Sequence, residues 1–144
     1  MGDGRRRRIP AGVKTELEQV HEQLLARLDA LEELARGSTP SRGLLSSTRY
    51  QLTRASGRRR KLLEERVYPM LLARLDGTAR DAVRALRDST ATMVADSANH
   101  IHRWTIDEIL DDWPGYCTAS AWMRRQMRER IAQEQRVLYP LLDD

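Results

Sequence analysis

The sequence predicts an all-α protein arranged as an up-down-up-down antiparallel four-helix bundle. Two observations lead to this fold class. Apolar residues recur at intervals of three and four along four long segments, which is the spacing of an amphipathic helix. Short segments rich in Gly, Pro and Asp separate these long segments. Because short turns bring consecutive helices back antiparallel to each other, the pattern indicates a bundle.

The first predicted helix opens at "TELE" (15–18), whose Thr and Glu have the spacing of a capping box, and it closes before Gly37. The next segment, "GSTPS", is a predicted turn in which Pro40 suits an early helical position. The second helix runs from about residue 44 to 75 and stops at "DGT". Pro69 lies inside this helix and predicts a kink or an early end there.

Thr78 and Asp81 resemble the cap of a third helix, which reaches about Leu110. The segment "DDWPG" then predicts a third turn. The last helix is expected over residues 118–142. These assignments give four long helices joined by short turns, as a bundle requires.

The inward-facing stripe of each predicted helix contains polar residues. The first helix, for example, has apolar residues on both sides of His21 at alternating steps of three and four. The interruptions in the four stripes are His21, Arg59, Thr90, Arg130 and Glu134. Counting residues to the turns, at about 1.5 Å per residue, places all of them near mid-height, to within about one turn. We therefore expect them to face one another in a polar chamber.

The composition indicates one domain. The chain has 144 residues, 40% of them apolar and 32% charged, with a net charge of +4. Much of that excess is the run Arg5–Arg8, in a segment, residues 1–13, that is predicted to be a disordered basic tail. Acidic residues interleave with the other arginines, so we do not expect nucleic-acid binding. The role of the tail and the oligomeric state stay open.

The cellular compartment is predicted from what the sequence lacks. A single cysteine, Cys117, excludes an internal disulfide and a cysteine zinc cluster. No apolar run reaches the length of a membrane span, and no secretory segment is recognisable. These observations predict a cytoplasmic protein without a membrane partner.

Three segments carry a resemblance to a known family. The sequences "LLEERVYPML" (62–71) and "AQEQRVLYPLL" (132–142) read as two copies of one helix ending, with acidic residues before an aromatic-Pro-Leu close. The sequence "VHEQLLARLDAL" (20–31) is similar to a helix that begins with a ligand histidine. Together they resemble the hemerythrin-like (HHE cation-binding) domain. The resemblance covers residues 14–144.

The resemblance implies a four-helix bundle holding two non-haem irons between its helices. His21 falls at the position of the first-helix ligand, and Glu134 at a bridging carboxylate. Arg59 and Arg130, however, fall where the family has histidines, and Thr90 falls at the third-helix histidine. Leu63 replaces the other bridging carboxylate. Because a protonated guanidinium cannot bind a metal ion, we predict a divergent member with no metal and no cofactor.

Several functions are compatible with this chamber. The main interpretation is a binding or regulatory module that holds a small molecule, such as an anion, in the bundle core, with His21, Arg59, Thr90, Arg130 and Glu134 as its ligand-binding residues. One alternative is a metal-independent enzyme, with His21 or Glu134 as the base and an arginine such as Arg130 stabilising an oxyanion. A second is a di-iron oxygen-binding or sensing protein, using ligands such as Glu64, Glu65 or His100. A third is a sealed, purely structural bundle. Whether the chain is an enzyme stays open, as does the identity of its ligand.

Overall fold

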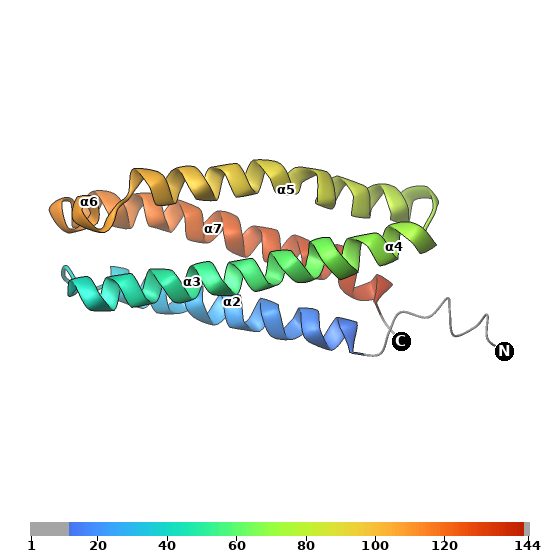
Figure 1. The fold of residues 1–144 in the computed structure, drawn as a ribbon, viewed down its shortest axis with the longest axis horizontal. Coiled ribbons are helices and arrows are strands. Elements are labelled where there is room, and N and C mark those ends of the chain that lie inside the picture. Colours follow the sequence, from blue (N-terminus) through green and yellow to red (C-terminus); the bar gives the residue numbers. More distant parts are fainter. Residues whose placement is uncertain (1–11, 143–144) are drawn as a thin grey trace.

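The computed structural model describes residues 12–142, and every regular element in that range is a helix (Figure 1). This confirms the all-α prediction. The elements are α2 (Val13–Ala35), α3 (Arg42–Leu62), a π-helical turn (Leu63–Val67), α4 (Tyr68–Arg74), α5 (Gly77–Arg103), α6 (Ile106–Asp111), α7 (Trp113–Leu138) and a 3-10 turn (Tyr139–Leu141). Within the described range, no helix combines the length and the apolar character needed to cross a bilayer.

The long helices α2, α3, α5 and α7 run side by side along the long axis of the molecule (Figure 1). Helix α2 packs against α3 and α7, and α5 packs against α7. Helix α5 also packs against α4, which continues the path of α3. Helices α3 and α5 are not among these closely packed pairs. Their separation leaves space between them beyond the α4 end.

Buried apolar side chains form separate groups along the molecule. Leu17 belongs to the group at the α4 end, with residues of α4, α5 and the chain end. Leu24 belongs to a middle group formed with α3 and α7. Trp104 and Trp113 belong to a third group at the opposite end. His21 lies between Leu17 and Leu24 on the inner face of α2, so a polar layer separates the first two groups.

Two of the predicted helix caps are wrong. Helix α2 begins at Val13, two residues before the predicted cap at Thr15, and Gly12 precedes it in a left-handed conformation with φ 92°. Val13 is fully buried, and this apolar contact favours the longer helix. Helix α5 likewise begins before Thr78, after Asp76, and has no side-chain cap. Residues 1–11 of the predicted tail lie outside the described residues.

The second predicted helix does not end at Pro69. Its path continues from α3 through Pro69 to the end of α4, and a wider turn, Leu63–Val67, ends two residues before the proline. In that turn the backbone N–H of Tyr68 donates to the carbonyl of Leu63, five residues earlier. Proline lacks the N–H that a regular helix needs at its position, and the wider turn absorbs this loss. The side chain of Tyr68, which follows this turn, is buried.

The third predicted helix is two helices. Helix α5 ends at Arg103, and Trp104 and Thr105 separate it from α6. The Thr105 hydroxyl accepts a hydrogen bond of 3.2 Å from the backbone N–H of Glu108, which is a capping interaction. Because Trp104 is buried with Trp113 at this end, the break turns the chain into the core.

The segment "DDWPG" opens a helix, although it predicted a turn. Asp112 Oδ1 accepts a 3.0 Å hydrogen bond from the backbone N–H of Gly115, and Pro114 lies in the first helical turn. Helix α7 therefore starts at Trp113, five residues before the predicted start at Thr118. This earlier start places Tyr116 inside the helix, with its side chain buried.

Candidate functional site

The carboxylate of Glu134 is the centre of a buried ion cluster. Glu134 has 0% exposure and comes from α7. Arg59 of α3 donates to it twice, from Nε to Oε1 at 2.9 Å and from Nη2 to Oε2 at 2.6 Å. Arg130 Nε donates to Oε2 at 2.9 Å, and His21 Nε2 lies 2.8 Å from Oε1. We call these four residues, His21, Arg59, Arg130 and Glu134, the Glu134 cluster.

Arg130 extends the cluster to α5. Its Nη2 donates to the carbonyl of Leu86 at 2.6 Å and lies 3.4 Å from the Thr90 hydroxyl. Its Nη1 donates to the hydroxyl of Ser89. The structure therefore brings together all five residues that the sequence predicted for the chamber, from four helices. The predicted role of these residues in binding a ligand stays a prediction, because in the structure they bind one another.

The geometry fixes the hydrogen-bonding roles of His21. A carboxylate only accepts, so His21 Nε2 must carry a proton and donate it to Glu134. His21 Nδ1 lies 2.6 Å from the hydroxyl of Tyr139, which can donate to it when the imidazole is neutral. Burial raises the pKa of Tyr139, which keeps that hydroxyl protonated. Tyr139 was absent from the predicted chamber and belongs to it.

The electrostatics do not favour acid–base catalysis by this cluster. Burial alone would raise the pKa of Glu134, but the hydrogen bonds from Arg59 and His21 outweigh it and hold the pKa at about 2. A general base works best with a pKa near the operating pH. Glu134 is therefore a weak base, and Arg130 and His21 already have partners within the cluster.

Acid should remove the stability that Glu134 contributes. The carboxyl has an ordinary pKa of 4.5 and one of about 2 in the folded protein. Its contribution is fully present above about pH 4.5 and is lost as the pH falls toward 2, a change of about 3 kcal/mol. Urea unfolding between pH 6 and pH 2 measures this loss. The Glu134→Gln variant should lack the part of this acid-induced loss of stability that comes from Glu134. An equal pH dependence of stability in both proteins would contradict the assignment of the loss to Glu134.

A di-iron centre does not fit these residues. The positions where the resemblance implies histidine ligands hold the guanidinium groups of Arg59 and Arg130, which only donate hydrogen bonds. Both oxygens of Glu134 already accept from these groups and from His21. Between residues 12 and 142, no three His, Cys, Asp or Glu side chains gather in a way that could hold a metal ion.

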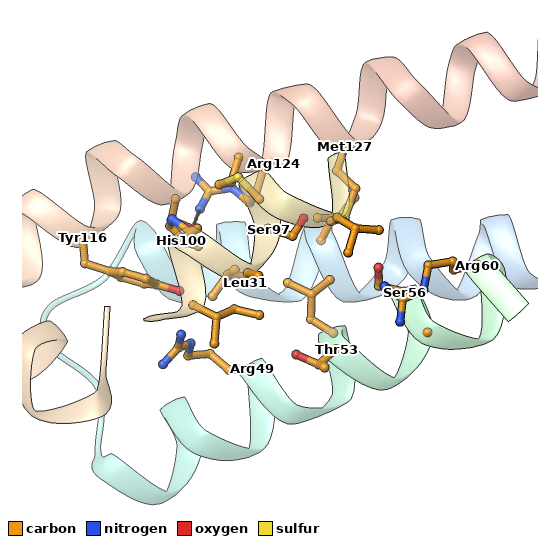
Figure 2. Close-up of a pocket in the computed structure, with 18 residues that line it drawn as sticks. Leu31, Arg49, Thr53, Ser56, Arg60, Ser97, His100, Tyr116, Arg124 and Met127 are labelled. Carbon is orange, nitrogen blue, oxygen red and sulfur yellow. Dashed lines mark hydrogen bonds between the residues drawn. The ribbon is translucent and has the colours of Figure 1, made fainter. Parts of the chain in front are cut away.

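A mostly apolar cavity lies beside the Glu134 cluster, toward the α6 end of the molecule (Figure 2). Its volume is about 220 Å³, space for on the order of seven waters or a small organic molecule. Leucine and methionine side chains form much of its wall. Three arginines also line it, Arg49, Arg60 and Arg124, and none of the described lining residues is acidic. An apolar cavity with unbalanced positive charge is suited to an organic anion.

Arg124 is the most unusual of these three arginines. It is 7% exposed, and its only hydrogen bond to a described residue runs from Nη1 to the hydroxyl of Ser120, at 2.6 Å. Its Nε is buried without a hydrogen-bond partner. The carboxylate of Glu32 acts on Arg124 electrostatically, but its ion pairs are with Arg36 and Arg128. Burial lowers the pKa of Arg124, yet arginine stays protonated in proteins. A buried cation without a directly bonded carboxylate is costly, which makes Arg124 a candidate partner for an anion in this cavity.

Aromatic side chains complete the end of the cavity around Arg124. The imidazole of His100 stacks on Tyr116, with 5.9 Å between ring centroids. The guanidinium of Arg49 lies 5.9 Å from the centroid of the same ring. Burial, together with the charge of Arg49, lowers the pKa of His100, so its imidazole is neutral and offers one donor and one acceptor. Figure 2 shows Arg49, His100, Tyr116 and Arg124 gathered at one end of the cavity.

The sequence prediction missed this second site. The predicted stripe of the last helix ran through Met123 and Met127, which are only partly buried, while Arg124 faces inward. A weak signal existed, because Arg124 lies seven residues before Ile131 and fourteen before Leu138, both of which are buried. This is the heptad spacing of an inward face. The helix was predicted to start only at Thr118. This late start hid the continuation of the inward face through Ser120 to Tyr116.

Comparison with known proteins does not assign the chain to a family. No family model matches the sequence, and the searches of curated proteins and of solved structures find no match either. The hemerythrin-like resemblance therefore stays a prediction that rests on the segments named above.

Proposed function

We propose that the chain is a metal-free, hemerythrin-like four-helix bundle that binds a small organic anion between its helices, in a binding or regulatory role. The single observation that carries this proposal is the apolar cavity lined by Arg49, Arg60 and Arg124 and by no described acidic residue. The parallel course of α2, α3, α5 and α7 in Figure 1 supports the bundle arrangement.

This proposal moves the ligand from the Glu134 cluster to the cavity beside it. The sequence predicted that surplus positive charge on Arg59 and Arg130 attracts the ligand. In the structure both arginines donate to Glu134, so one of their two positive charges is balanced and both side chains are held by the carboxylate. No carboxylate bonds directly to Arg124, since Glu32 pairs with two other arginines, and Arg124 lines the mostly apolar cavity. The Glu134 cluster then acts as a rigid structural layer beside the binding site.

The shape of the cavity indicates which anion fits. Arg49 and Arg124 offer guanidinium groups at one end of the cavity. This end suits a carboxylate, because a planar guanidinium can donate two parallel hydrogen bonds to its oxygens. The remaining wall is mostly apolar and suits a short aliphatic or aromatic body. Met123 and Met127 add flexible side chains that can adapt to the shape of that body. An apolar monocarboxylate of about ten non-hydrogen atoms meets these requirements.

Matched ligands test the proposal. Isothermal titration calorimetry should show binding of octanoate or 3-phenylpropanoate, with affinity at least about 10-fold above that of octanamide or 3-phenylpropanamide, which lack the charge. Gly57 supplies a control because it borders the cavity, and a Cβ built there meets no atom within 4 Å. Gly57→Leu should fill this space and weaken binding of every probe. Equal affinity for the acids and the amides would refute an anion site.

A further inference from the structure

A cavity smaller than the one around Arg124 lies between α3, α5 and α7, next to the Glu134 cluster. Its volume is about 60 Å³, which is room for about two waters or one small anion. Arg59, Tyr68, Thr90 and Arg130 are among the residues that line it. It adjoins the cavity around Arg124, and five residues line both of them: Ser56, Arg60, Val94, Ser97 and Met127. Neither Arg49 nor Arg124 lines the smaller cavity, and an apolar organic acid would not fit it.

The hydroxyl of Tyr68 has no hydrogen-bond partner within the described structure, although its side chain is 1% exposed. Burial raises the pKa of Tyr68, so the hydroxyl stays protonated and needs an acceptor. The charge of Glu134 raises this pKa further, but the Glu134 oxygens accept from other groups, and none of them bonds the Tyr68 hydroxyl. Arg130 and Arg59 act in the opposite direction, and their guanidinium groups only donate. The acceptor must therefore come from whatever fills the cavity.

The guanidinium groups supply further donors and a surplus of positive charge. Arg59 uses two of its five N–H groups on Glu134, and no described residue accepts from the other three. Arg59 and Arg130 together balance only one carboxylate, Glu134, when His21 is neutral. Arg60 and Glu64 are exposed at the rim of this cavity. Their opposite charges cancel, so the surplus positive charge of the cavity is unchanged.

We infer that this cavity binds one small inorganic anion, of the size of chloride or nitrate, held by the Tyr68 hydroxyl and by N–H groups of Arg59. An anion fits this site better than water does, because a water must also find acceptors for its own two hydrogens. The residues that line the buried end of this cavity offer mainly hydrogen-bond donors. The inference is independent of the organic anion proposed for the larger cavity.

A chloride titration tests the inference. Sodium chloride replaces sodium gluconate at constant ionic strength, since gluconate is too large for a cavity of about 60 Å³. The melting temperature should rise saturably, by about 2–4 °C at a chloride concentration of roughly five times Kd. Tyr68→Phe keeps the ring but removes the donor and should abolish the rise. Tyr50→Phe, at an exposed tyrosine, should keep it.

Two further measurements identify the bound species and its site. Crystals grown with bromide should show one anomalous peak within hydrogen-bond distance of the Tyr68 hydroxyl, and this result decides the question even where Tyr68→Phe fails to fold. Arg124→Met should keep the chloride effect, because Arg124 does not line this cavity. A water without anomalous signal at this position, or a chloride effect that survives Tyr68→Phe, would overturn the inference.

Discussion

Replacing Glu134 with glutamine should lower the free energy of unfolding by about 3–5 kcal/mol. The substitution keeps the size of the side chain but removes its charge. Arg59 and Arg130 then stay in the protein interior without a counter-charge, since each donates to Glu134 and forms no other ion pair within the described structure. Urea unfolding followed by circular dichroism at pH 7 measures this change.

Two variants separate this effect from general damage to α7. Glu129→Gln alters an exposed carboxylate on the same helix and should change stability by less than about 0.5 kcal/mol. The triple variant Arg59→Met, Arg130→Met and Glu134→Leu removes the whole set of charges, and its stability should return close to that of the original chain. A cost below about 1 kcal/mol for Glu134→Gln would show that the cluster is not closed as described.

The sequence was sufficient to predict the Glu134 cluster because helical spacing fixes which residues share a face. In α2, His21 continues the line of buried residues from Leu17 to Leu24, so its inward direction follows from the 3.6-residue period. In α7, Arg130 and Glu134 are four residues apart and therefore adjacent on one face. The short turns between helices then fix the positions of these residues along the helix axes to within about one helical turn.

The helix ends could not be predicted as well, because local signals compete. The sequence "TELE" has the spacing of a capping box, yet burial of Val13 extends the helix past it. The segment "DDWPG" contains turn residues, but Asp and Pro are also favoured at a helix start, and the contact of Trp113 with the carbonyl of Gly37 favours that outcome. Tertiary contacts decide which of these local signals sets the start of the helix, and such contacts cannot be read from a single sequence.

The cavity around Arg124 was hidden for a related reason. Helix α7 carries several arginines, and most of them face solvent or form surface ion pairs, as Arg128 does with Asp29 and Glu32. The amino-acid composition of the helix does not distinguish an inward-facing arginine from these surface arginines. Because an inward arginine without a carboxylate is costly, the structure rather than the pattern identifies Arg124 as a functional candidate.

Arg124→Met should therefore change stability and binding in opposite directions. The substitution removes a buried cation whose Nε has no partner, and Ser120 can turn its hydroxyl to a carbonyl of its own helix. We expect the ligand-free protein to gain about 1–2 kcal/mol of stability. Binding of octanoate should weaken by about 100-fold or more, because the buried charge partner is lost. Calorimetric titration and urea unfolding of the same preparation measure both effects.

The neighbouring Arg125→Met variant is the matched control, because Arg125 is exposed on the same helix turn and does not line the cavity. It should leave octanoate affinity and stability nearly unchanged. A purely structural role for Arg124 predicts the reverse pattern, in which Arg124→Met destabilises the protein and no probe binds the original chain. Stability gained together with binding lost is the signature of a residue kept for a ligand, since selection for folding alone would have replaced it.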